Sequence, residues 1–271
     1  MKKALSIAGS DCSGGAGIQA DIKAFSAHGV YGMTVVTSVV AENTYRVTDY
    51  QDIRPDMIKK QIDDVFDDIP PDAVKIGMLS CRDTMLAVAE KLQAWQPKNI
   101  VVDPVMYAKN GSALMEESAI GTLLSEIVPL ADVITPNIPE AEEMTGLTIK
   151  TQADMREAAL LIHKMGCRAV VVKGGHSQGD AVDILYDGTA FYEYPAPRIC
   201  TQHTHGTGCT FSAAIAANLA LGHLVHEAVG RAKAYIGVAI AHAPRLGKGN
   251  GPTHHFYEMY NSHFGEGQHG K

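Results

Sequence analysis

Short runs of β-branched and apolar residues alternate with longer helical patterns along nearly the whole chain. Two of these runs, Ile100–Val102 and Val170–Val172, contain only Val and Ile, which is typical of strands buried on both faces. Strands that alternate with helices form right-handed β-α-β units, and such units build a mostly parallel sheet covered by helices on both sides. The alternation therefore predicts an α/β fold, a three-layer α/β/α sandwich with a mostly parallel central sheet.

The predicted elements follow from the period of each segment. The expected strands are Ala4–Ala8, Gly32–Ala41, Ala73–Ile76, Asn99–Asp103, Asp132–Thr135 and Ala169–Lys173, followed by an antiparallel hairpin of Ala181–Tyr186 and Ala190–Tyr194. The expected helices are Gly17–His28, Pro55–Phe66, Arg82–Trp95, Ser118–Ile127, Pro139–Thr145, Gln152–Met165, Thr210–Leu221 and Val225–Ala243. Since no Pro-, Gly- or Ser-rich linker interrupts the pattern, we expect one domain over residues 1–260 and a frayed tail over residues 261–271.

The composition restricts what the chain can bind. A formal net charge of −7 and a pI near 5.9 argue against nucleic acid, because binding a phosphate backbone requires a basic face. The apolar run Ala4–Ala8 is too short for a signal peptide, and no later run approaches the length of a membrane span. The five cysteines are odd in number and lack Cys-x-x-Cys spacing, so we expect neither a disulfide framework nor a zinc site. These features predict a cytoplasmic protein that binds small molecules and not membranes.

Polar residues and glycines follow the predicted strands at the point where each strand ends. They are Gly9-Ser10-Asp11, Glu42-Asn43-Thr44, Gly77-Met78-Leu79, Asp103-Pro104-Val105, Pro136-Asn137 and Gly174-Gly175-His176. In an open parallel sheet, ligands bind outside the carboxyl ends of the strands. These residues therefore predict a ligand site along one edge of the sheet.

The segment Thr204–Cys209 is the strongest local signal. It reads Thr-His-Gly-Thr-Gly-Cys and leads directly into the predicted helix Thr210–Leu221. Its glycines allow a sharp turn that aims backbone N–H groups at one point, and the helix N-terminus adds partial positive charge, so the segment can form an anion hole for a phosphoryl group. The same helix terminus favours a thiolate at Cys209. A glycine turn followed by a buried structural cysteine explains the pattern equally well.

Oxygen-bearing side chains at the strand ends are suited to Mg²⁺ bound to a nucleotide. Asp103, Asn137 and Glu140 supply such oxygens, and Mg²⁺ takes one or two protein ligands together with phosphates and water. A helix capping box is the alternative for Asn137 and Glu140, and it is the better explanation of that pair alone. Lys173 ends a buried strand, where its ammonium group must reach solvent or an anion such as phosphate.

Two other features favour structural explanations. The loop Gly14–Gly17 matches neither the dinucleotide-binding nor the P-loop glycine spacing, so a tight strand-to-helix turn is the simpler interpretation. His254 and His255 follow a turn-rich segment and have no carboxylate at metal-binding spacing, which favours a surface or hydrogen-bonded role over zinc.

Taken in order, these segments resemble the ribokinase superfamily, and more narrowly the hydroxymethylpyrimidine/phosphomethylpyrimidine kinases of thiamine biosynthesis. The resemblance extends from about Ala4 to Phe256. The segments that carry it are Ile7–Asp11, Ser13–Asp21, Lys75–Leu79, Asp103–Met106, Thr135–Asn137, Lys173–His176 and Thr204–Cys209. Several motifs in a fixed order are far more specific than any one of them.

The resemblance implies a role for each matching residue. The residues that would line a pyrimidine pocket are Gly9, Ala16, Asp21, Val40, Glu42, Met78 and Val105. Those that would hold the nucleotide ATP are Asn137, Lys173, Thr204 and Thr207, and those for Mg²⁺ are Asp103 and Glu140. Gly206 and Gly208 would form the anion hole, and Cys209 would occupy the position of the catalytic base. With the nucleotide bound, we expect the pKa of the Cys209 thiol to lie near neutrality, because the helix terminus and Lys173 favour the thiolate while Mg²⁺-ATP opposes it.

The resemblance also implies a function and an assembly. The chain would use ATP to phosphorylate 4-amino-5-hydroxymethyl-2-methylpyrimidine and then its monophosphate, and it would form a homodimer. Glu42 departs from the glutamine that is common in the family at this position, which leaves base recognition open. Pyridoxal kinase shares the motif set and is the alternative. A catalytically silent ligand sensor on the same fold is a third possibility, against which Asp103, Lys173 and Cys209 argue.

Overall fold

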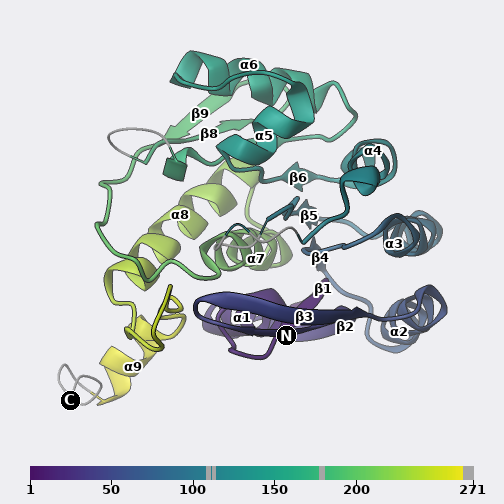
Figure 1. Ribbon diagram of the computed structural model, residues 1–271, viewed down its shortest axis with the longest axis horizontal. Helices are drawn as coiled ribbons and strands as arrows, with labels where there is room; N and C mark the ends of the chain where they lie inside the picture. The colour runs from purple at the N-terminus through teal and green to yellow at the C-terminus, as the bar shows by residue number, and fades with distance from the viewer. Residues whose placement is uncertain (108–110, 112–113, 177–180, 265–271) are drawn as a thin grey trace.

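A nine-stranded sheet runs through the centre of the molecule in the computed structural model, which describes residues 1–107, 111, 114–176 and 181–264 (Figure 1). The strands are β1 (Lys3–Asp11), β2 (Tyr31–Asn43), β3 (Arg46–Asp52), β4 (Ala73–Ile76), β5 (Ile100–Val102), β6 (Val133–Ile134), β7 (Val170–Val172), β8 (Asp183–Tyr186) and β9 (Phe191–Tyr194). Their order across the sheet is β3-β2-β1-β4-β5-β6-β7-β8-β9. The strands from β2 to β7 pair in parallel, and the antiparallel strands β3, β8 and β9 lie at the two edges.

Helices cover both faces of this sheet, as Figure 1 shows. One layer consists of α1 (Gly17–Ala27), α7 (Thr207–Ala220) and α8 (Val225–Ala241). The other consists of α2 (Pro55–Asp68), α3 (Arg82–Trp95), α4 (Ile120–Thr122), α5 (Ile138–Thr145) and α6 (Gln152–His163). The predicted three-layer α/β/α sandwich with a mostly parallel sheet is therefore confirmed, and so is the predicted hairpin, formed by β8 and β9.

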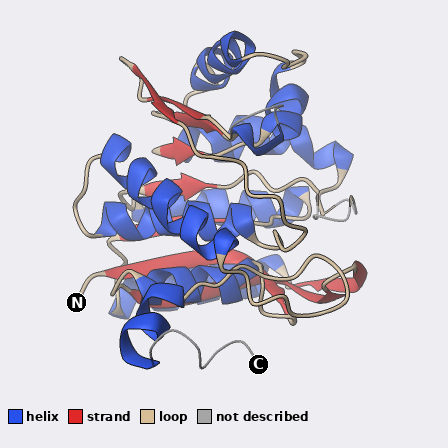
Figure 2. Cartoon of the chain, turned by 90° about the vertical axis from the view of Figure 1, so that its left-hand side faces the viewer, coloured by secondary structure: helices blue, strands red, loops and turns tan. Residues whose placement is uncertain are grey.

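The side chains of each strand divide the core into two parts, one on each face of the sheet. On β7, Val171 packs with α1, α7 and α8, whereas Val170 and Val172 pack with the opposite layer. Successive residues of a strand point to opposite faces, so a continuous Val or Ile run contributes to both parts of the core. Figure 2 shows this layering of helices and strands from the side.

The carboxyl ends of the parallel strands meet at one edge of the sheet. β1 continues to Asp11 and β2 to Asn43, so both strands extend further than predicted. Asp103 directly follows β5, and a β-bridge between Asn137 and Lys173 keeps the segments after β6 and β7 side by side. The residues predicted to gather at a ligand-binding edge are thus brought there by the parallel topology.

Two segments differ in their secondary structure from the prediction. The strand β3 is unpredicted, because Arg46–Asp52 is polar and mostly exposed, and its place in the sheet depends on backbone pairing with β2. The predicted helix Ser118–Ile127 is instead a succession of 3-10, α and π turns that continues to Leu130. Both differences arise where tertiary contacts outweigh the local pattern.

The C-terminal part of the chain also departs from the prediction. Helix α9 (Tyr257–Phe264) includes residues 261–264, which we expected in the frayed tail, and residues 265–271 lie outside the described residues. Within the part of the chain that the structure describes, no helix combines the length and the apolar character needed to cross a membrane.

Candidate active site

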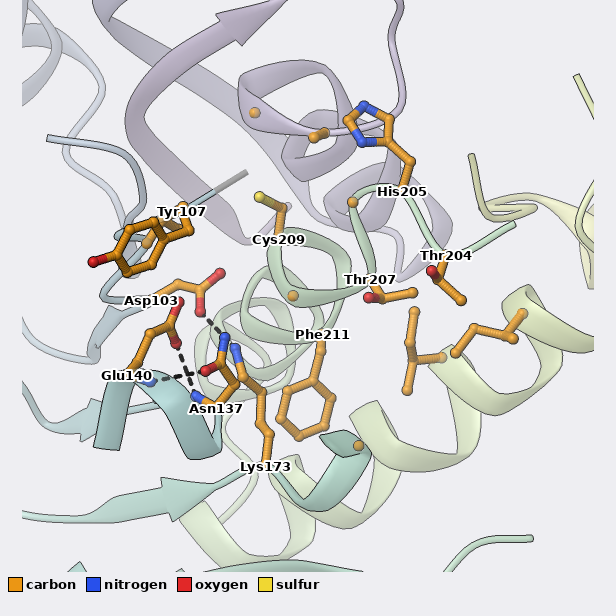
Figure 3. Close-up of a pocket in the computed structure, with 18 of the residues that line it drawn as sticks. Asp103, Tyr107, Asn137, Glu140, Lys173, Thr204, His205, Thr207, Cys209 and Phe211 are labelled. Carbon is orange, nitrogen blue, oxygen red and sulfur yellow. Dashed lines mark hydrogen bonds and ion pairs between the residues drawn. The ribbon is translucent and has the colours of Figure 1, made fainter. Parts of the chain in front are cut away.

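A cavity of about 470 Å³ opens at the carboxyl edge of the sheet. The strand ends, the N-terminus of α7 and one side of α8 enclose it, and Figure 3 shows the side chains that meet there. The predicted site residues that line it are Gly9, Ala16, Val40, Glu42, Met78, Asp103, Val105, Asn137, Glu140, Lys173, Thr204, Gly206, Thr207, Gly208 and Cys209. Asp21 is the exception among the predicted site residues.

The first turn of α7 lies at Gly206–Gly208, the segment that we predicted to bind an anion. The helix begins at Thr207, earlier than the predicted Thr210, and Gly206 is its N-cap residue with a φ of 73°. A Cβ atom at Gly206 would lie 1.8 Å from the carbonyl oxygen of Gly15, so only glycine allows the two loops to approach this closely. The N–H groups of a first helical turn have no intrahelical acceptor, and here they border the cavity. The N–H group of Thr207 donates to the Thr204 carbonyl oxygen at 3.4 Å, and those of Gly208 and Cys209 are suited to bind the oxygens of a phosphoryl group.

Asp103 and Lys173 form an ion pair beside this helix terminus. Lys173 Nζ lies 2.8 Å from Asp103 Oδ1, and the Thr135 hydroxyl donates to the same oxygen at 3.2 Å. A Cβ atom at Gly208 would lie 3.3 Å from Asp103 Oδ2 and 3.4 Å from Lys173 Nζ, so both charges adjoin the first turn of α7. Although burial opposes ionisation, the charges of Lys173 and then Lys75 hold the pKa of Asp103 below its ordinary value. The lysine predicted to seek an anion has a carboxylate partner and still borders the cavity.

Asn137 and Glu140 form the capping box of α5 and also line the cavity. Asn137 Oδ1 accepts the Glu140 N–H at 2.9 Å, and Glu140 Oε2 accepts the Asn137 N–H at 2.8 Å. Burial raises the pKa of Glu140 to about 7; the charge of Lys173 opposes this shift and the charge of Asp103 adds to it. A nearby cation stabilises the ionised form of a buried carboxyl group. Asp103 and Glu140 therefore fit a Mg²⁺ ion. The capping and metal-binding interpretations are therefore compatible.

Cys209 lies in the first turn of α7, and its sulfur is placed between Asp103 and His205 in Figure 3. Burial raises the pKa of its thiol to about 11, against the lowering effects of Lys75 and the Gly17 N–H group. The direction is opposite to the lowering of the pKa that we expected from the helix terminus, and the value near neutrality expected with the nucleotide bound stays a prediction. The local sequence shows neither how deeply the thiol is enclosed nor which carboxylates lie near it. Proton acceptance by Cys209 thus depends on the positive charges around the sulfur.

Asp21, predicted to line the substrate pocket, lies beneath it. Its side chain is 0% exposed, its Oδ2 atom is 2.9 Å from Lys75 Nζ, and the Ser6 hydroxyl donates to the same oxygen at 2.5 Å. A carboxylate enclosed in this way does not contact a ligand in the cavity. Lys75, which had no predicted role, borders the cavity in its place.

One end of the cavity, which we name the β1 end, contains Asp11, Glu42, His205 and Cys209. His205 Nε2 lies 2.8 Å from Asp11 Oδ2, and that oxygen also accepts the N–H groups of Gly15–Ala16 at 2.9 and 2.7 Å. One potential ligand atom from each of Asp11, Glu42 and His205 lies within 4.8 Å of the others. Burial, followed by the negative charge of Asp11, raises the pKa of Glu42 to about 7.

Sequence reasoning did not assign site roles to Asp11 and His205, although both lie in segments that carry the resemblance. Their hydrogen bond joins residues separated by 194 positions, so no local pattern reveals it. The position of Asp11 at a strand end was the available signal, because polar residues gather there.

The opposite end, which we name the α8 end, is lined by Asp183, Phe211, Lys233, Ile236 and Ile240. Lys233 Nζ lies 2.7 Å from Asp183 Oδ2, and Asp183 Oδ1 accepts the Gly174 N–H at 2.9 Å. Apolar surface with a few polar groups suits a flat ring such as a nucleotide base. Sequence reasoning missed this end, because Ile236 and Ile240 have the same spacing on α8 as ordinary core residues.

Comparison with known proteins places these observations in a family. The phosphomethylpyrimidine kinase family model matches residues 11–254. The chain is 51% identical over 261 residues to the hydroxymethylpyrimidine/phosphomethylpyrimidine kinase of Rhizobium meliloti (strain 1021), covering 95% of this chain and 98% of that protein. It is 49% identical over 252 residues to the thiamine biosynthesis bifunctional protein ThiED of Geobacter sulfurreducens; these residues are 93% of this chain but 51% of that relative, so the chain spans about half its length.

A solved structure also matches the chain over nearly its whole length. The ADP complex of Bacillus subtilis pyridoxal kinase superposes with a TM-score of 0.90 at 43% identity, covering 96% of this chain and 100% of that chain. The fold is thus shared with a nucleotide-binding vitamin kinase along nearly its entire length. On the family match and the identity to relatives of the same length, the chain belongs to the phosphomethylpyrimidine kinase family.

Proposed function

We propose that the chain is an ATP-dependent kinase of thiamine biosynthesis that phosphorylates the hydroxymethyl group of 4-amino-5-hydroxymethyl-2-methylpyrimidine and then phosphorylates the monophosphate to the diphosphate. One observation carries the proposal: a single cavity in a member of this family unites Cys209, the first turn of α7 and the Asp103–Lys173 pair. These groups offer a proton acceptor, an anion site and balanced charges. Phosphoryl transfer requires positioning and charge stabilisation of this kind.

The arrangement of these groups suggests how the transfer proceeds. The substrate hydroxyl would lie near Cys209, with the γ-phosphate of ATP at the first turn of α7. The hydroxyl proton moves to the thiolate form of Cys209, which becomes the thiol, while the oxygen bonds to the γ-phosphorus and the bond from that phosphorus to the bridging oxygen breaks to release ADP. The N–H groups of α7 and the Lys173 ammonium stabilise the negative charge on the transferring group.

Asp103 and Glu140 are the residues that would hold Mg²⁺, which when bound neutralises charge on the nucleotide phosphates. Both carboxyl groups are held in place by neighbouring groups. The ammonium group of Lys173 balances the charge of Asp103, and the capping box orients Glu140. Asn137, Thr204 and Thr207 border the same region and would contact the phosphates. The α8 end would then receive the adenine ring.

Glu42 is suited to recognise the aminopyrimidine in place of the more common glutamine. A 4-aminopyrimidine edge presents an N–H donor beside a ring-nitrogen acceptor, so its partner must offer one acceptor and one donor. Because burial and Asp11 raise the pKa of Glu42 to about 7, much of the carboxyl group is protonated near neutral pH. A protonated carboxyl group offers a carbonyl oxygen as acceptor and an O–H group as donor. An amide likewise provides one acceptor and one donor.

Pyridoxal kinase is the second candidate function, favoured by the 43% identity to the Bacillus subtilis enzyme. Pyridoxal also carries a hydroxymethyl group on an aromatic nitrogen ring, but it lacks the amino edge that Glu42 would read. The two substrates should therefore differ in their dependence on Glu42. A catalytically silent sensor is disfavoured by the complete set of Asp103, Lys173 and Cys209 in the cavity.

The proposal extends to assembly and compartment. The family resemblance supports a homodimer. All five cysteines are free, which agrees with a reducing, cytoplasmic environment.

A substrate panel tests the function directly. The purified chain is incubated with Mg²⁺-ATP and either the hydroxymethylpyrimidine, its monophosphate or pyridoxal, and the products are identified by mass. We expect the pyrimidine to reach the diphosphate. If the reaction stops at the monophosphate, the chain catalyses only the first phosphorylation. If only pyridoxal is phosphorylated, the chain is a pyridoxal kinase, the second candidate.

The role of Cys209 is tested by replacing the thiol. Cys209→Ala should lower kcat by roughly 10²–10⁴ with little change in KM for ATP, because the thiol acts on the proton and not on the nucleotide. Cys209→Asp should restore part of the rate and move the acidic limb of the pH profile downward, since a carboxylate ionises at lower pH. Cys200→Ala, at an exposed cysteine, is the matched control and should retain the wild-type rate. Near wild-type turnover by Cys209→Ala would show that the thiol only packs.

A further inference from the structure

Lys75 is a buried ammonium group at the floor of the cavity that the mechanism above does not use. It lies on β4 and is 0% exposed to solvent, yet it borders the cavity. Its Nζ atom is 2.9 Å from Asp21 Oδ2, and the Ser6 hydroxyl donates to the same oxygen. Ser6 and Lys75 are register partners on the adjacent strands β1 and β4. The strand pairing therefore fixes the backbone from which both side chains extend.

Stability of the fold is a weak explanation for this ion pair. Burying two charges carries a large desolvation cost, and apolar replacements of such pairs are often neutral or stabilising. The second oxygen of Asp21, Oδ1, has no hydrogen-bond partner among the described residues, so the carboxylate is not fully satisfied. Gly77 keeps space for the ammonium group: a Cβ atom there would lie 2.6 Å from Lys75 Nζ and 2.9 Å from Ala8 Cβ.

The Cys209 thiol lies in the same cavity and is a group on which this positive charge can act. Cys209 and Lys75 border the same cavity, and α7 contacts β4. The N–H group of Gly17, at the start of α1, hydrogen-bonds to the sulfur. Burial raises the pKa of the thiol, Asp21 and Asp103 raise it further, and Lys75 is the strongest influence in the opposite direction.

We propose that Lys75 is a positioning residue for proton transfer: its fixed ammonium charge stabilises the thiolate of Cys209, and Asp21 holds that charge in place. Its part in catalysis rests on the proposed function. The thiolate takes the proton of the substrate hydroxyl, the oxygen bonds to the γ-phosphorus, and ADP leaves with the electron pair of the broken P–O bond. Lys75 itself gains and loses no proton. Lys173 also lies near the thiol, but it pairs with Asp103 beside the phosphate site, so the two lysines serve different partners.

The test measures alkylation of Cys209 by iodoacetamide in the enzyme without substrate, from about pH 6 to pH 10. Mass spectrometry of the Cys209 peptide separates this thiol from the other cysteines. Only the thiolate reacts, so the rate at each pH reports its ionised fraction. Lys75→Met should shift the profile upward and slow alkylation at pH 8 about tenfold, the effect of a shift of one pH unit. Asp21→Asn should shift the profile downward, because it removes a negative charge near the thiol.

Lys75→Met leaves Asp21 buried without its partner, so a second variant guards against loss of folding. The double variant Lys75→Met/Asp21→Leu removes both charges, and it should still alkylate more slowly than the wild type, because Lys75 affects the thiol more than Asp21 does. Circular dichroism and thermal melting establish that each variant is folded. The matched control is Lys233→Met, which removes an ion-paired lysine at the α8 end and should leave the Cys209 profile unchanged.

A wild-type profile in the folded double variant would overturn the inference, as would shifts in the same direction for Lys75→Met and Asp21→Asn. Since alkylation requires neither ATP nor a pyrimidine, this result is independent of the substrate panel. If the enzyme phosphorylates none of the tested substrates but Lys75→Met and Asp21→Asn shift the alkylation profile in opposite directions, the inference about Lys75 holds and the proposed function is wrong.

Discussion

The β1 end and the α8 end of the cavity hold their side chains in different ways. At the β1 end, Asp11, Glu42 and His205 are mutually close polar groups, and Asp11 also accepts backbone N–H groups from Gly15–Ala16. At the α8 end, Phe211, Ile236 and Ile240 present apolar walls, and the Lys233–Asp183 pair is the polar element. The first end is a network of partly buried charges, and the second is a surface with one ion pair.

This difference has energetic consequences. In a buried polar network, each lost partner leaves another group unsatisfied, so its members act together. Apolar walls tolerate changes that conserve volume, and they contribute affinity through buried area. We therefore expect substitutions at the β1 end to alter rate and substrate choice, and those at the α8 end to alter ATP affinity.

Apart from replacement of the Cys209 thiol, the largest effect is expected from Gly206→Ala, which would separate the two loops that form the β1 end. The new Cβ atom would meet the Gly15 carbonyl oxygen at 1.8 Å, and the residue has a φ of 73°. Displacing the first turn of α7 from the reacting atoms should lower kcat/KM by about 100-fold or more. Steady-state kinetics and thermal melting measure the change.

Gly222→Ala, just beyond the C-terminal end of α7, is the matched control. Its φ of 97° also lies in the region that favours glycine, but no atom of the described residues lies within 4 Å of the added Cβ atom. It should lower the free energy of unfolding by about 1–2 kcal/mol and leave kcat unchanged. If both alanine variants lose activity equally, the close approach of the two loops is unimportant.

An intermediate effect is expected from Lys233→Met at the α8 end. Asp183 would lose its charged partner, and Gly174, whose N–H group Asp183 accepts, would be held less firmly. A hydrogen bond to a charged group contributes about 1.5–3 kcal/mol, so KM for ATP should rise more than tenfold while kcat changes little. Lys91→Met, which removes a surface ion pair with Asp63, should leave both constants unchanged. A fall in kcat alone would break the proposed division between the two ends.

The smallest effect near neutral pH is expected from Glu42→Gln. The pKa of Glu42 is raised to about 7, so the protonated form predominates below this pH and is lost as the pH rises through it. Pyrimidine binding by the wild type should weaken about tenfold between pH 6 and pH 8, whereas the Gln variant should bind nearly independently of pH and differ about twofold at pH 7. Isothermal titration at each pH measures the dissociation constant.

Glu42→Met is the companion variant, because it can neither donate nor accept a hydrogen bond. It should weaken pyrimidine binding more than pyridoxal binding. Equal losses for both substrates would mean that Glu42 does not read the amino edge, and an unchanged pH dependence in Glu42→Gln would assign the titration to another group.

Local sequence was sufficient for the parts of the site that depend on one segment. The spacing of Asn137 and Glu140 predicted a capping box, and the structure contains it. The glycines at Gly206 and Gly208 predicted an anion-binding turn at a helix terminus, and the first turn of α7 lies there. In each case, the backbone hydrogen bonds involved join residues only a few positions apart.

Long-range contacts account for what the sequence did not predict. The placement of Asp21 beneath the cavity depends on Lys75, 54 positions away, and the Asp11–His205 contact spans 194 positions. The pKa of Cys209 depends on burial and on Lys75, Asp21 and Asp103, which come from distant parts of the chain. Burial and charge are properties of the assembled surroundings.

By itself, the sequence determined the layered α/β fold and the edge at which the cavity opens, because the hydrophobic period selects strands and helices and a parallel topology collects the strand ends. Only the tertiary structure decided which of the collected groups are charged, which are paired and which reach the cavity. The physical reason is that the cost of a buried charge depends on every neighbour within a few ångströms, and most of those neighbours come from distant parts of the chain.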